Sequence, residues 1–403
     1  MSATALAEAD VVRPHAEAVG PGRVGSVDML RGLIMVLMAL DHVRDYFTNV
    51  PFSPTDLTQT STALFLTRWI THFCAPGFVF LAGTSAFFRG ARGRSRGELS
   101  RYLLTRGLWL VVLELTVSRT GWMFNLDYTN EPLILLVLWA IGVSMIVLAG
   151  LVWLPLPAVA AAGVVMISGH NALDGIRPEA LGAWGPLWAV LHVQAAVPLA
   201  GGRVLFVAYP LVPWIGVMAA GYAFGALFSR PADERRRLFL RLGIGLALGF
   251  LVLRAANLYG DPSPWTEQAS PARTLLSFLN TTKYPPSLLF LLMTLGPAII
   301  LLPALERLSG PPARFLGTIG RVPLFYYLLH IYLIHATALA VGTLAGFPPS
   351  MFLTLWARPP EGWGYPLPVV YLVWAGVVLA LYPACRWFAA VKARRRDAWL
   401  GYL

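Results

Sequence analysis

Ten long apolar runs dominate the chain of 403 residues, and they constrain its fold more than any other feature. Each run is close to the roughly 20 helical residues that cross the hydrocarbon core of a bilayer. The chain is 57% hydrophobic and only 13% charged, against about 25% charged in a soluble domain. The sequence therefore predicts an all-α integral membrane protein, a polytopic bundle of about ten transmembrane helices. The expected spans are residues 29–48, 64–88, 102–119, 132–150, 152–168, 204–228, 238–256, 285–304, 322–345 and 366–388.

The basic residues are distributed as the positive-inside rule requires. Most of the 31 lysines and arginines lie in alternate connections between the apolar runs, and such connections face the cytoplasm in membrane proteins. We therefore expect both termini to be cytoplasmic. The same distribution accounts for the net charge of +11, so we predict no nucleic acid as a partner. The domain organisation that follows is a disordered tail over residues 1–25, a transmembrane domain over 26–390 and a basic tail over 391–403.

The first apolar run carries an unusual density of ionisable groups. An ionisable side chain at bilayer depth costs several kcal/mol unless it is paired or faces a wet interior, so it is a functional-site hypothesis by default. Two of these groups, Asp28 and Arg31, are three residues apart on one helix face. They either pair with each other or help a donor molecule to dock at the cytoplasmic mouth. The remaining ionisable groups of the run are Asp41, His42, Arg44 and Asp45.

Several polar groups on different spans are expected at one depth. A rise of 1.5 Å per helical residue places them roughly 12–21 Å above the cytoplasmic edge. We interpret this layer as a polar chamber in the middle to outer half of the membrane. The alternative for each histidine is a structural hydrogen bond to a neighbouring helix. The layer contains His42, His72, Glu114, His330 and His335.

Two kinds of site are disfavoured by the motifs. No span has the His-x-x-x-His or Glu-x-x-His spacing of a helical metal site, so we predict no metal. Cys74 and Cys385 are expected in different halves of the membrane, so we predict no disulfide. The chain also lacks a Gly-rich phosphate loop. Cytoplasmic arginines such as Arg106 and Arg321 suit a donor with several phosphates, although such clusters are also ordinary topology signals.

The outer connections are long, and long loops in membrane proteins are often functional. Residues 169–203 contain Trp184 and Trp188, which predict an interfacial or re-entrant helix. Residues 257–284 end with Lys283 and Tyr284. We therefore expect a polar substrate at the outer face.

Small residues and prolines mark the expected helix contacts. The segments Phe78–Ser85 and Gly216–Gly221 place glycine and alanine where two helices can approach closely. Pro76, Pro210 and Pro213 are expected to interrupt their spans.

Five motifs resemble a known family. The chain is similar to the bacterial membrane acyltransferases related to the catalytic domain of heparan-α-glucosaminide N-acetyltransferase, and the resemblance runs from about residue 23 to 390. The motifs are Arg23-x-x-Ser26-Val27-Asp28-x-Leu30-Arg31-Gly32 with His42, Pro76–Gly83, Tyr209–Gly216, Lys283–Leu288, and Gly320–Tyr327 with His330 and His335.

The resemblance implies a transmembrane acetyl transfer. Acetyl-CoA would bind from the cytoplasmic side, and a sugar amine or hydroxyl would accept the acetyl group on the far side. In this scheme His42 acts as general base, with Asp41 to orient it and His72 as a second catalytic candidate. The expected acetyl-CoA-binding residues are Asp28, Arg31, Arg106, Arg321 and His330. The expected acceptor-binding residues are Arg44, Asp45, Lys283, Tyr284 and His335.

One departure from the family affects the assignment of the base. The animal lysosomal enzyme is associated with a catalytic histidine after its first span, whereas residues 48–71 contain none here. Either His42 or His72 then takes this role. We expect a bacterial inner membrane, an acceptor among cell-envelope glycans, and partners limited to the bilayer and that acceptor, with a homo-oligomer left open. The main alternative is a secondary transporter that uses the polar layer as a path, and a third is a non-catalytic scaffold.

Overall fold

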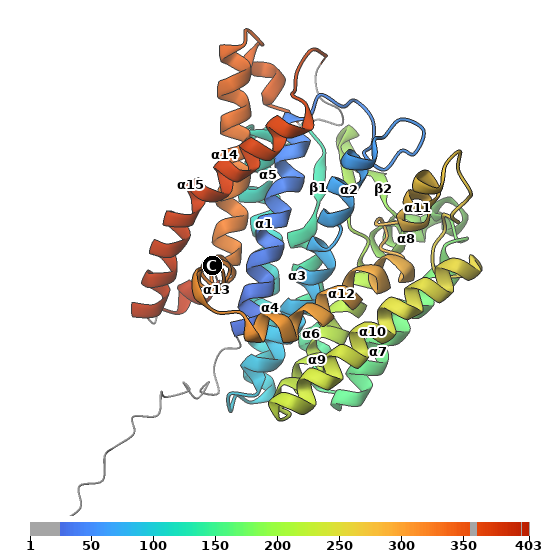
Figure 1. Cartoon of the computed structure of the whole chain (residues 1–403), viewed down its shortest axis with the longest axis vertical. Helices are drawn as coiled ribbons and strands as arrows, with labels where there is room; N and C mark the ends of the chain where they lie inside the picture. The colour runs from blue at the N-terminus through green and yellow to red at the C-terminus, as the bar shows by residue number, and fades with distance from the viewer. Residues whose placement is uncertain (1–24, 355–360, 396, 403) are drawn as a thin grey trace, which may run out of the picture.

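The computed structural model describes residues 25–354, 361–395 and 397–402. Almost all of the expected N-terminal tail lies outside these residues, as does Arg23 of the first motif. The described chain forms a bundle of long helices with one small sheet toward one end (Figure 1).

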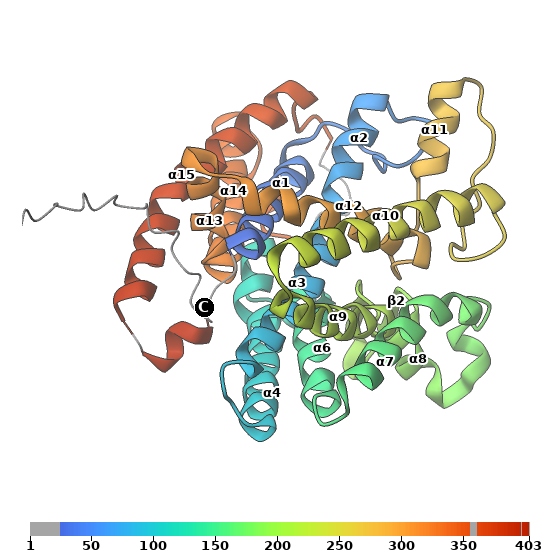
Figure 2. The same cartoon turned by 60° about the horizontal axis from the view of Figure 1, so that its bottom comes forward.

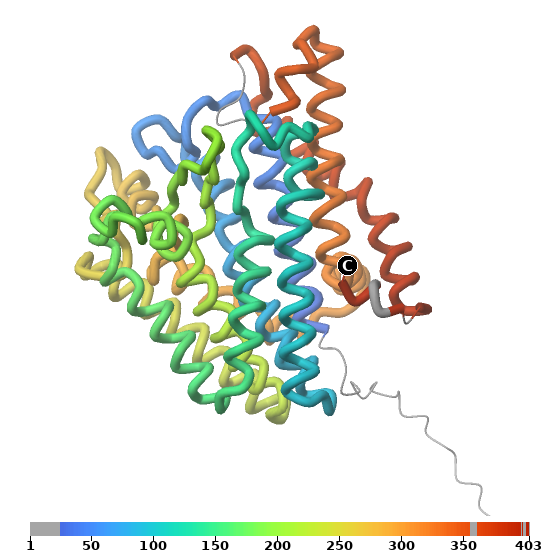
Figure 3. Tube along the Cα trace, turned by 180° about the vertical axis from the view of Figure 1, so that it is seen from behind, coloured from blue at the N-terminus to red at the C-terminus, as the bar shows by residue number. Residues whose placement is uncertain are grey.

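The long helices follow one another in alternating directions along the bundle (Figure 3). By length and composition alone, seven helical stretches of the described chain could cross a membrane, and each coincides with an expected span. The expected spans at 29–48, 102–119 and 132–150 correspond to α1, α4 and α6. The long helices are α1 (Gly25–Phe47), α3 (Cys74–Gly90), α4 (Arg96–Leu113), α6 (Val137–Leu151), α7 (Leu156–Gly169), α9 (Leu211–Gly225), α10 (Ala232–Ala256), α12 (Leu288–Arg307), α14 (Pro323–Leu344) and α15 (Leu367–Arg394).

Shorter elements connect or extend these helices. The short α-helices are α2 (Thr62–Thr71), α5 (Arg119–Met123), α8 (Gly185–His192), α11 (Pro271–Leu279) and α13 (Gly310–Gly320). A π-helical turn, η1 (Glu114–Ser118), joins α4 to α5. The 3₁₀ turns are η2 (His170–Leu173), η3 (Pro178–Trp184), η4 (Ala200–Gly202), η5 (Ala226–Ser229), η6 (Pro349–Phe352) and η7 (Ala398–Tyr402). The sheet has the order β1-β3-β2 and consists of β1 (Leu133–Leu135), β2 (Ala195–Pro198) and β3 (Val204–Val207).

Helix α1 occupies the centre of the bundle. It packs against α3, α12, α13, α14 and α15, and Figures 1 and 2 show it enclosed by them. Most of its residues are buried, including Asp28, Asp41 and Arg44. A buried charge must be paired or hydrogen-bonded, so the surrounding helices supply the partners of α1.

The contact of α3 with α9 depends on glycine. A Cβ on Gly83 would lie 2.1 Å from the carbonyl oxygen of Met218, and a Cβ on Gly221 would lie 2.1 Å from that of Phe80. Only glycine permits the two backbones to approach this closely. The prediction that these two small-residue segments mark a close helix contact is confirmed.

Three spans begin differently from expectation. Residues 64–88 are divided between α2 and α3 at His72 and Phe73. Spans 132–150 and 204–228 begin with β1 and β3, which pair in parallel. Pro76 and Pro213 lie in the first turns of α3 and α9, and Pro210 directly precedes α9. Pro76 and Pro210 therefore interrupt their expected spans, because Pro76 follows the break between α2 and α3 and Pro210 separates β3 from α9. Pro213 does not interrupt its span, because proline suits a first turn, where its missing N–H has no partner to lose.

The segment singled out by its tryptophans and the C-terminal segment also take defined forms. Residues 169–203 form short turns, the eight-residue α8 and strand β2, with Trp184 70% exposed. Helix α15 continues to Arg394, and η7 then packs on α4, where Arg106 donates to the Gly401 carbonyl at 2.9 Å. Cys74 and Cys385 are buried free thiols, as expected.

Candidate active site

A polar pocket of about 220 Å³ lies beside the C-terminal half of α1. We call it the histidine pocket, and we call the end of the bundle where α1 begins the arginine-rich end. Helix α1 contributes two neighbouring carboxylates and a histidine, and the small sheet forms part of the opposite wall. The lining residues are Asp41, His42, Arg44, Asp45, Arg68, Trp122, Ile134, Leu136, Val137, Phe206, Tyr209, Lys283, Tyr284 and Tyr327.

Two histidines from distant segments meet at this pocket. His42 Nδ1 lies 2.6 Å from His330 Nε2, and the two rings stack with centroids 4.9 Å apart. His330 is fully buried on α14, whereas His42 retains some exposure and lines the pocket. Trp122 packs edge-on against His42 at 4.8 Å and limits its movement. The pair thus joins a solvent-facing ring to a buried one.

The hydrogen bonds assign the protons of this pair. His330 Nδ1 lies 2.5 Å from the Tyr327 carbonyl oxygen and 3.1 Å from that of Tyr326. Carbonyl oxygens only accept, so this nitrogen carries the proton. Nε2 of a neutral His330 is then an acceptor, and His42 Nδ1–H donates to it. His42 Nε2 is left with a lone pair, as a general base requires.

Asp41 is engaged by two arginines. Its carboxylate lies 2.8 Å from Arg44 Nη1, accepts from Thr71 Oγ1 at 2.8 Å and is paired with Arg68. Arg44 also contacts Asp45 at 2.7 Å. Successive helical residues point about 100° apart, so Asp41 and His42 face different neighbours. The partner of His42 is accordingly His330 rather than Asp41.

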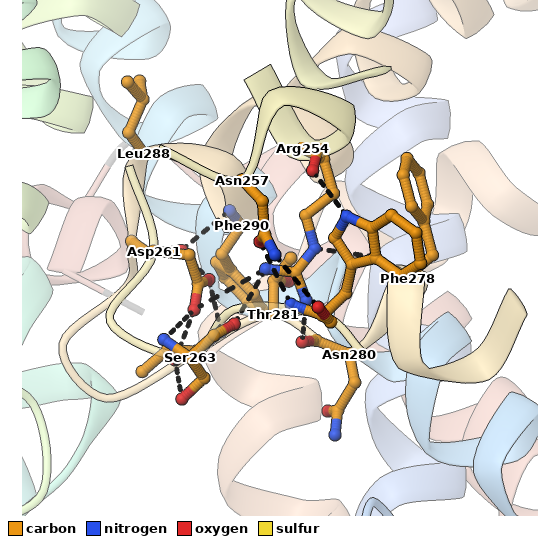
Figure 4. Close-up of polar contacts among 12 residues, drawn as sticks. Arg254, Asn257, Asp261, Ser263, Phe278, Asn280, Thr281, Leu288 and Phe290 are labelled. Carbon is orange, nitrogen blue, oxygen red and sulfur yellow. Dashed lines mark hydrogen bonds and ion pairs between the residues drawn. The ribbon is translucent and has the colours of Figure 1, made fainter. Parts of the chain in front are cut away.

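A braced loop delivers Lys283 and Tyr284 to the pocket. Buried Arg254 donates to the carbonyl groups of four residues, and Asp261 accepts from Thr282 and Ser287 (Figure 4). These bonds fix both ends of the segment that carries Lys283. Burial raises the pKa of the Tyr284 phenol, but the nearby Lys283 and Arg68 lower it further, and the net pKa lies below its usual value. The field at this wall therefore favours negative charge.

A second pocket of about 300 Å³ opens at the arginine-rich end. Among the described residues, its lining has six basic side chains and no carboxylate, so we call it the arginine pocket. Arg31 is held there by Asp28 at 3.0 Å and Ser85 at 2.8 Å, and Arg89 stacks on the Tyr102 ring at 3.5 Å. Such a lining suits a ligand with several phosphates. The basic residues are Arg31, Arg89, Arg92, Arg106, Arg321 and Lys392.

The linings of the two pockets approach each other on two helices. On α6, Val137 lines the histidine pocket and Ile141 lines the arginine pocket. On α14, Tyr327 lines the histidine pocket and Pro323 lines the arginine pocket. Four helical residues rise about 6 Å, so the wall between the pockets is about one helical turn thick.

The other expected site residues take structural positions. His72 is buried against the Phe290 ring and lies outside the lining of both pockets. His335 joins α14 to α5 and η6 through the carbonyl groups of Gly121 (2.8 Å) and Phe352 (2.5 Å). Glu114 accepts from the Leu138 and Trp139 amides and so caps α6. Asp28 acts through Arg31.

Sequence reasoning missed the wall formed by β1, β3 and the end of α5. Ile134, Phe206 and Trp122 line the histidine pocket, yet all three read as ordinary apolar residues in the sequence. The Pro210 and Pro213 pair was a usable signal, because it delays the start of α9 and leaves the preceding residues free to form a strand.

The chain matches the sequence model described as heparan-alpha-glucosaminide N-acetyltransferase, catalytic, over residues 23–252. That range is more than half of the chain; it contains His42 and most of the arginine pocket, but not Lys283, Arg321 or His330. A search of curated proteins finds no match. The chain therefore belongs to the family of the heparan-alpha-glucosaminide N-acetyltransferase catalytic domain, whose members are membrane acetyltransferases that in general use acetyl-CoA.

Proposed function

We propose that this protein transfers an acetyl group across the membrane. Acetyl-CoA binds in the arginine pocket, and an amine or hydroxyl of a sugar accepts the acetyl group in the histidine pocket. The observation that carries this proposal is the thin wall between two chemically different pockets, with the His42–His330 pair on one side of it. A cell-envelope glycan is the acceptor class we expect.

The arginine pocket suits the phosphates of acetyl-CoA. Guanidinium groups bind phosphate through charge-assisted and often bidentate hydrogen bonds. Arg89, Arg106 and Arg321 lie where an anionic ligand would enter from the arginine-rich end. The narrow remainder of the acetyl donor would then extend along α6 and α14 toward His42.

The proton transfers follow from the assigned tautomers. His42 Nε2 takes a proton from the acceptor amine or hydroxyl as its nucleophilic atom bonds to the thioester carbonyl carbon. The carbon–sulfur bond then breaks, and the same His42 proton neutralises the departing thiolate. His330 does not contact the reacting atoms in this scheme; it is a positioning residue that fixes the His42 ring and stabilises its charged form.

The orientation of the protein is part of the proposal. We place the protein in a bacterial inner membrane with ten transmembrane spans. The arginine-rich end and both termini then face the cytoplasm. The positive-inside distribution of arginine supports this arrangement, and so does the supply of acetyl-CoA in that compartment.

The test is an acetyl-transfer assay on purified protein with radiolabelled acetyl-CoA and a panel of amino sugars. We expect acceptor-dependent release of CoA from wild type and none above background from His42→Ala, with both proteins equally folded. Equal release by both would remove His42 from the chemistry. Movement of an unmodified sugar across a vesicle membrane without CoA release would support the transporter alternative instead.

A further inference from the structure

A cluster of metal-ligating side chains lies outside both pockets. His170 in η2 and Asp174, one turn later, meet His192 at the end of α8, and one possible ligand atom of each lies within 4.8 Å of the others. His192 Nε2 is 3.0 Å from Asp174 Oδ1, and the two imidazole rings are 5.6 Å apart between centroids. The sequence signal is weak, because the histidines are separated by a turn-rich segment rather than by a helical repeat.

Three of the four ring nitrogens in this cluster lack a partner with hydrogen-bond geometry among the described residues. They are both nitrogens of His170 and Nδ1 of His192, and the two side chains are only 2% and 1% exposed. The one backbone group of the described chain that acts on the His170 ring is that of Pro286, without meeting hydrogen-bond geometry. Buried polar groups in native proteins are almost always satisfied. A simple His192–Asp174 ion pair would explain two of the three side chains, but not the buried ring of His170.

We propose that His170, Asp174 and His192 bind a divalent metal ion of the zinc class. Two imidazoles and one carboxylate form a common donor set for tetrahedral Zn²⁺, with the fourth position taken by water or another small ligand. Ligand atoms in such a site lie about 3.4 Å apart, so small side-chain rotations would close the cluster around the ion. We expect Asp174 to bind through Oδ1, because Asn171 Nδ2 donates to its Oδ2 at 2.8 Å and orients the carboxylate.

The ion would act as a clamp on the wall of the histidine pocket. The Leu288 amide donates to Asn171 Oδ1 at 2.8 Å, so the metal-binding turn is bonded to the first residue of α12. The loop directly before α12 carries Lys283 and Tyr284, and Asp261 braces that loop through Ser287 at 2.6 Å. Bound metal would therefore stabilise the outer connections without touching the reacting atoms. This inference goes beyond the proposed acetyl transfer and does not depend on it.

The test uses the full chain purified in detergent, stripped with a chelator and dialysed against Zn²⁺. We expect about one zinc per chain by elemental analysis and a higher unfolding temperature with zinc than without. His170→Gln and Asp174→Asn should lose both effects. Co²⁺ should give the visible absorption bands of a tetrahedral site in wild type and not in these two variants. The matched control is Glu179→Gln, which removes an exposed carboxylate of the same segment and should behave as wild type.

Three results would overturn the proposal. They are wild type without stoichiometric zinc, zinc retained by both variants, and zinc lost equally by the Glu179→Gln control. Should His170→Gln fail to fold, Asp174→Asn and the Co²⁺ spectrum of wild type still decide the matter. His42→Ala should bind zinc normally, so failure of the acetyl-transfer proposal would be seen separately.

Discussion

The arginine pocket and the histidine pocket are both charged, but their charges are arranged in opposite ways. The part of the arginine pocket's lining that the structure describes has six basic side chains and no carboxylate. In the histidine pocket, Asp41 and Asp45 engage Arg44 and Arg68 directly. Excess positive charge attracts an anionic ligand, whereas paired charges hold one another in place. In the proposed reaction, the arginine pocket would therefore attract the anionic donor, while the ion pairs of the histidine pocket would hold its own charged side chains in place.

The largest effect should come from His42→Gln. Without the base at Nε2, acetyl transfer should fall by about 10²–10⁴-fold, the usual contribution of a general base. Steady-state CoA release measures the loss, and equilibrium binding of acetyl-CoA serves as the control, because the arginine pocket is unchanged. A rate of CoA release within about threefold of wild type would show that the chemistry does not depend on His42 in the histidine pocket.

The next largest effect should come from Asp41→Asn. Arg68 would keep its buried positive charge without its direct counterion, although Arg44 would retain Asp45, and such a loss lowers the free energy of unfolding by about 3–5 kcal/mol. The matched control is Asp45→Asn, whose side chain is 42% exposed and should contribute below about 1 kcal/mol. Denaturant titration of the two variants compares them. Equal losses would contradict the central place of Asp41 in the network.

Arginine-pocket variants should change acetyl-CoA binding alone. Arg106→Gln and Arg321→Gln should each raise the KM for acetyl-CoA about 10-fold or more, since a hydrogen bond to a charged group contributes about 1.5–3 kcal/mol. The kcat and the KM for the acceptor should stay near wild type. Arg237→Gln is the matched control, because Arg237 is exposed and lines neither pocket. An equal rise of the KM for acetyl-CoA in this control would mean that the arginines of the pocket only set the membrane topology and do not bind acetyl-CoA.

The smallest effect should be a difference in salt dependence. Added salt should raise the KM for acetyl-CoA several-fold, because it screens attraction to the open, cationic pocket. The KM for a neutral sugar acceptor should hardly change, since an uncharged ligand has no net charge for salt to screen. Steady-state kinetics over a range of salt concentrations measure both constants. An equal rise of the two KM values would contradict the expected electrostatic difference between the pockets.

The height of a side chain along the bundle could be predicted from the sequence, whereas the direction in which it faces around its helix could not. Helical rise alone placed His42 and His330 at nearly the same height, and the structure joins them at 2.6 Å. The same argument placed His335 in the polar layer, and the family resemblance suggested an acceptor-binding role, but its ring bonds to backbone carbonyls between helices. Rotation about a helix axis depends on packing against other helices, which one sequence does not reveal.

Irregular segments were the hardest part of the fold to anticipate. Apolar runs predict helices well, yet β1 and β3 are apolar too, and their pairing joins residues far apart in the chain. His170 and His192 lie in such a segment, and their proximity depends on a turn and the short helix α8. Local spacing rules detect ligands on a single helix and so overlook a cluster of this kind.

The most direct test of the account is the sidedness of the reaction. Protein is reconstituted in vesicles and the orientation is determined by protease access to the arginine-rich end. Labelled acetyl-CoA is supplied only on the side of the arginine pocket, and an amino sugar only on the other side. The account predicts acetylated sugar on the side opposite to acetyl-CoA, dependent on His42. Product formed only when both substrates are on the same side would contradict it.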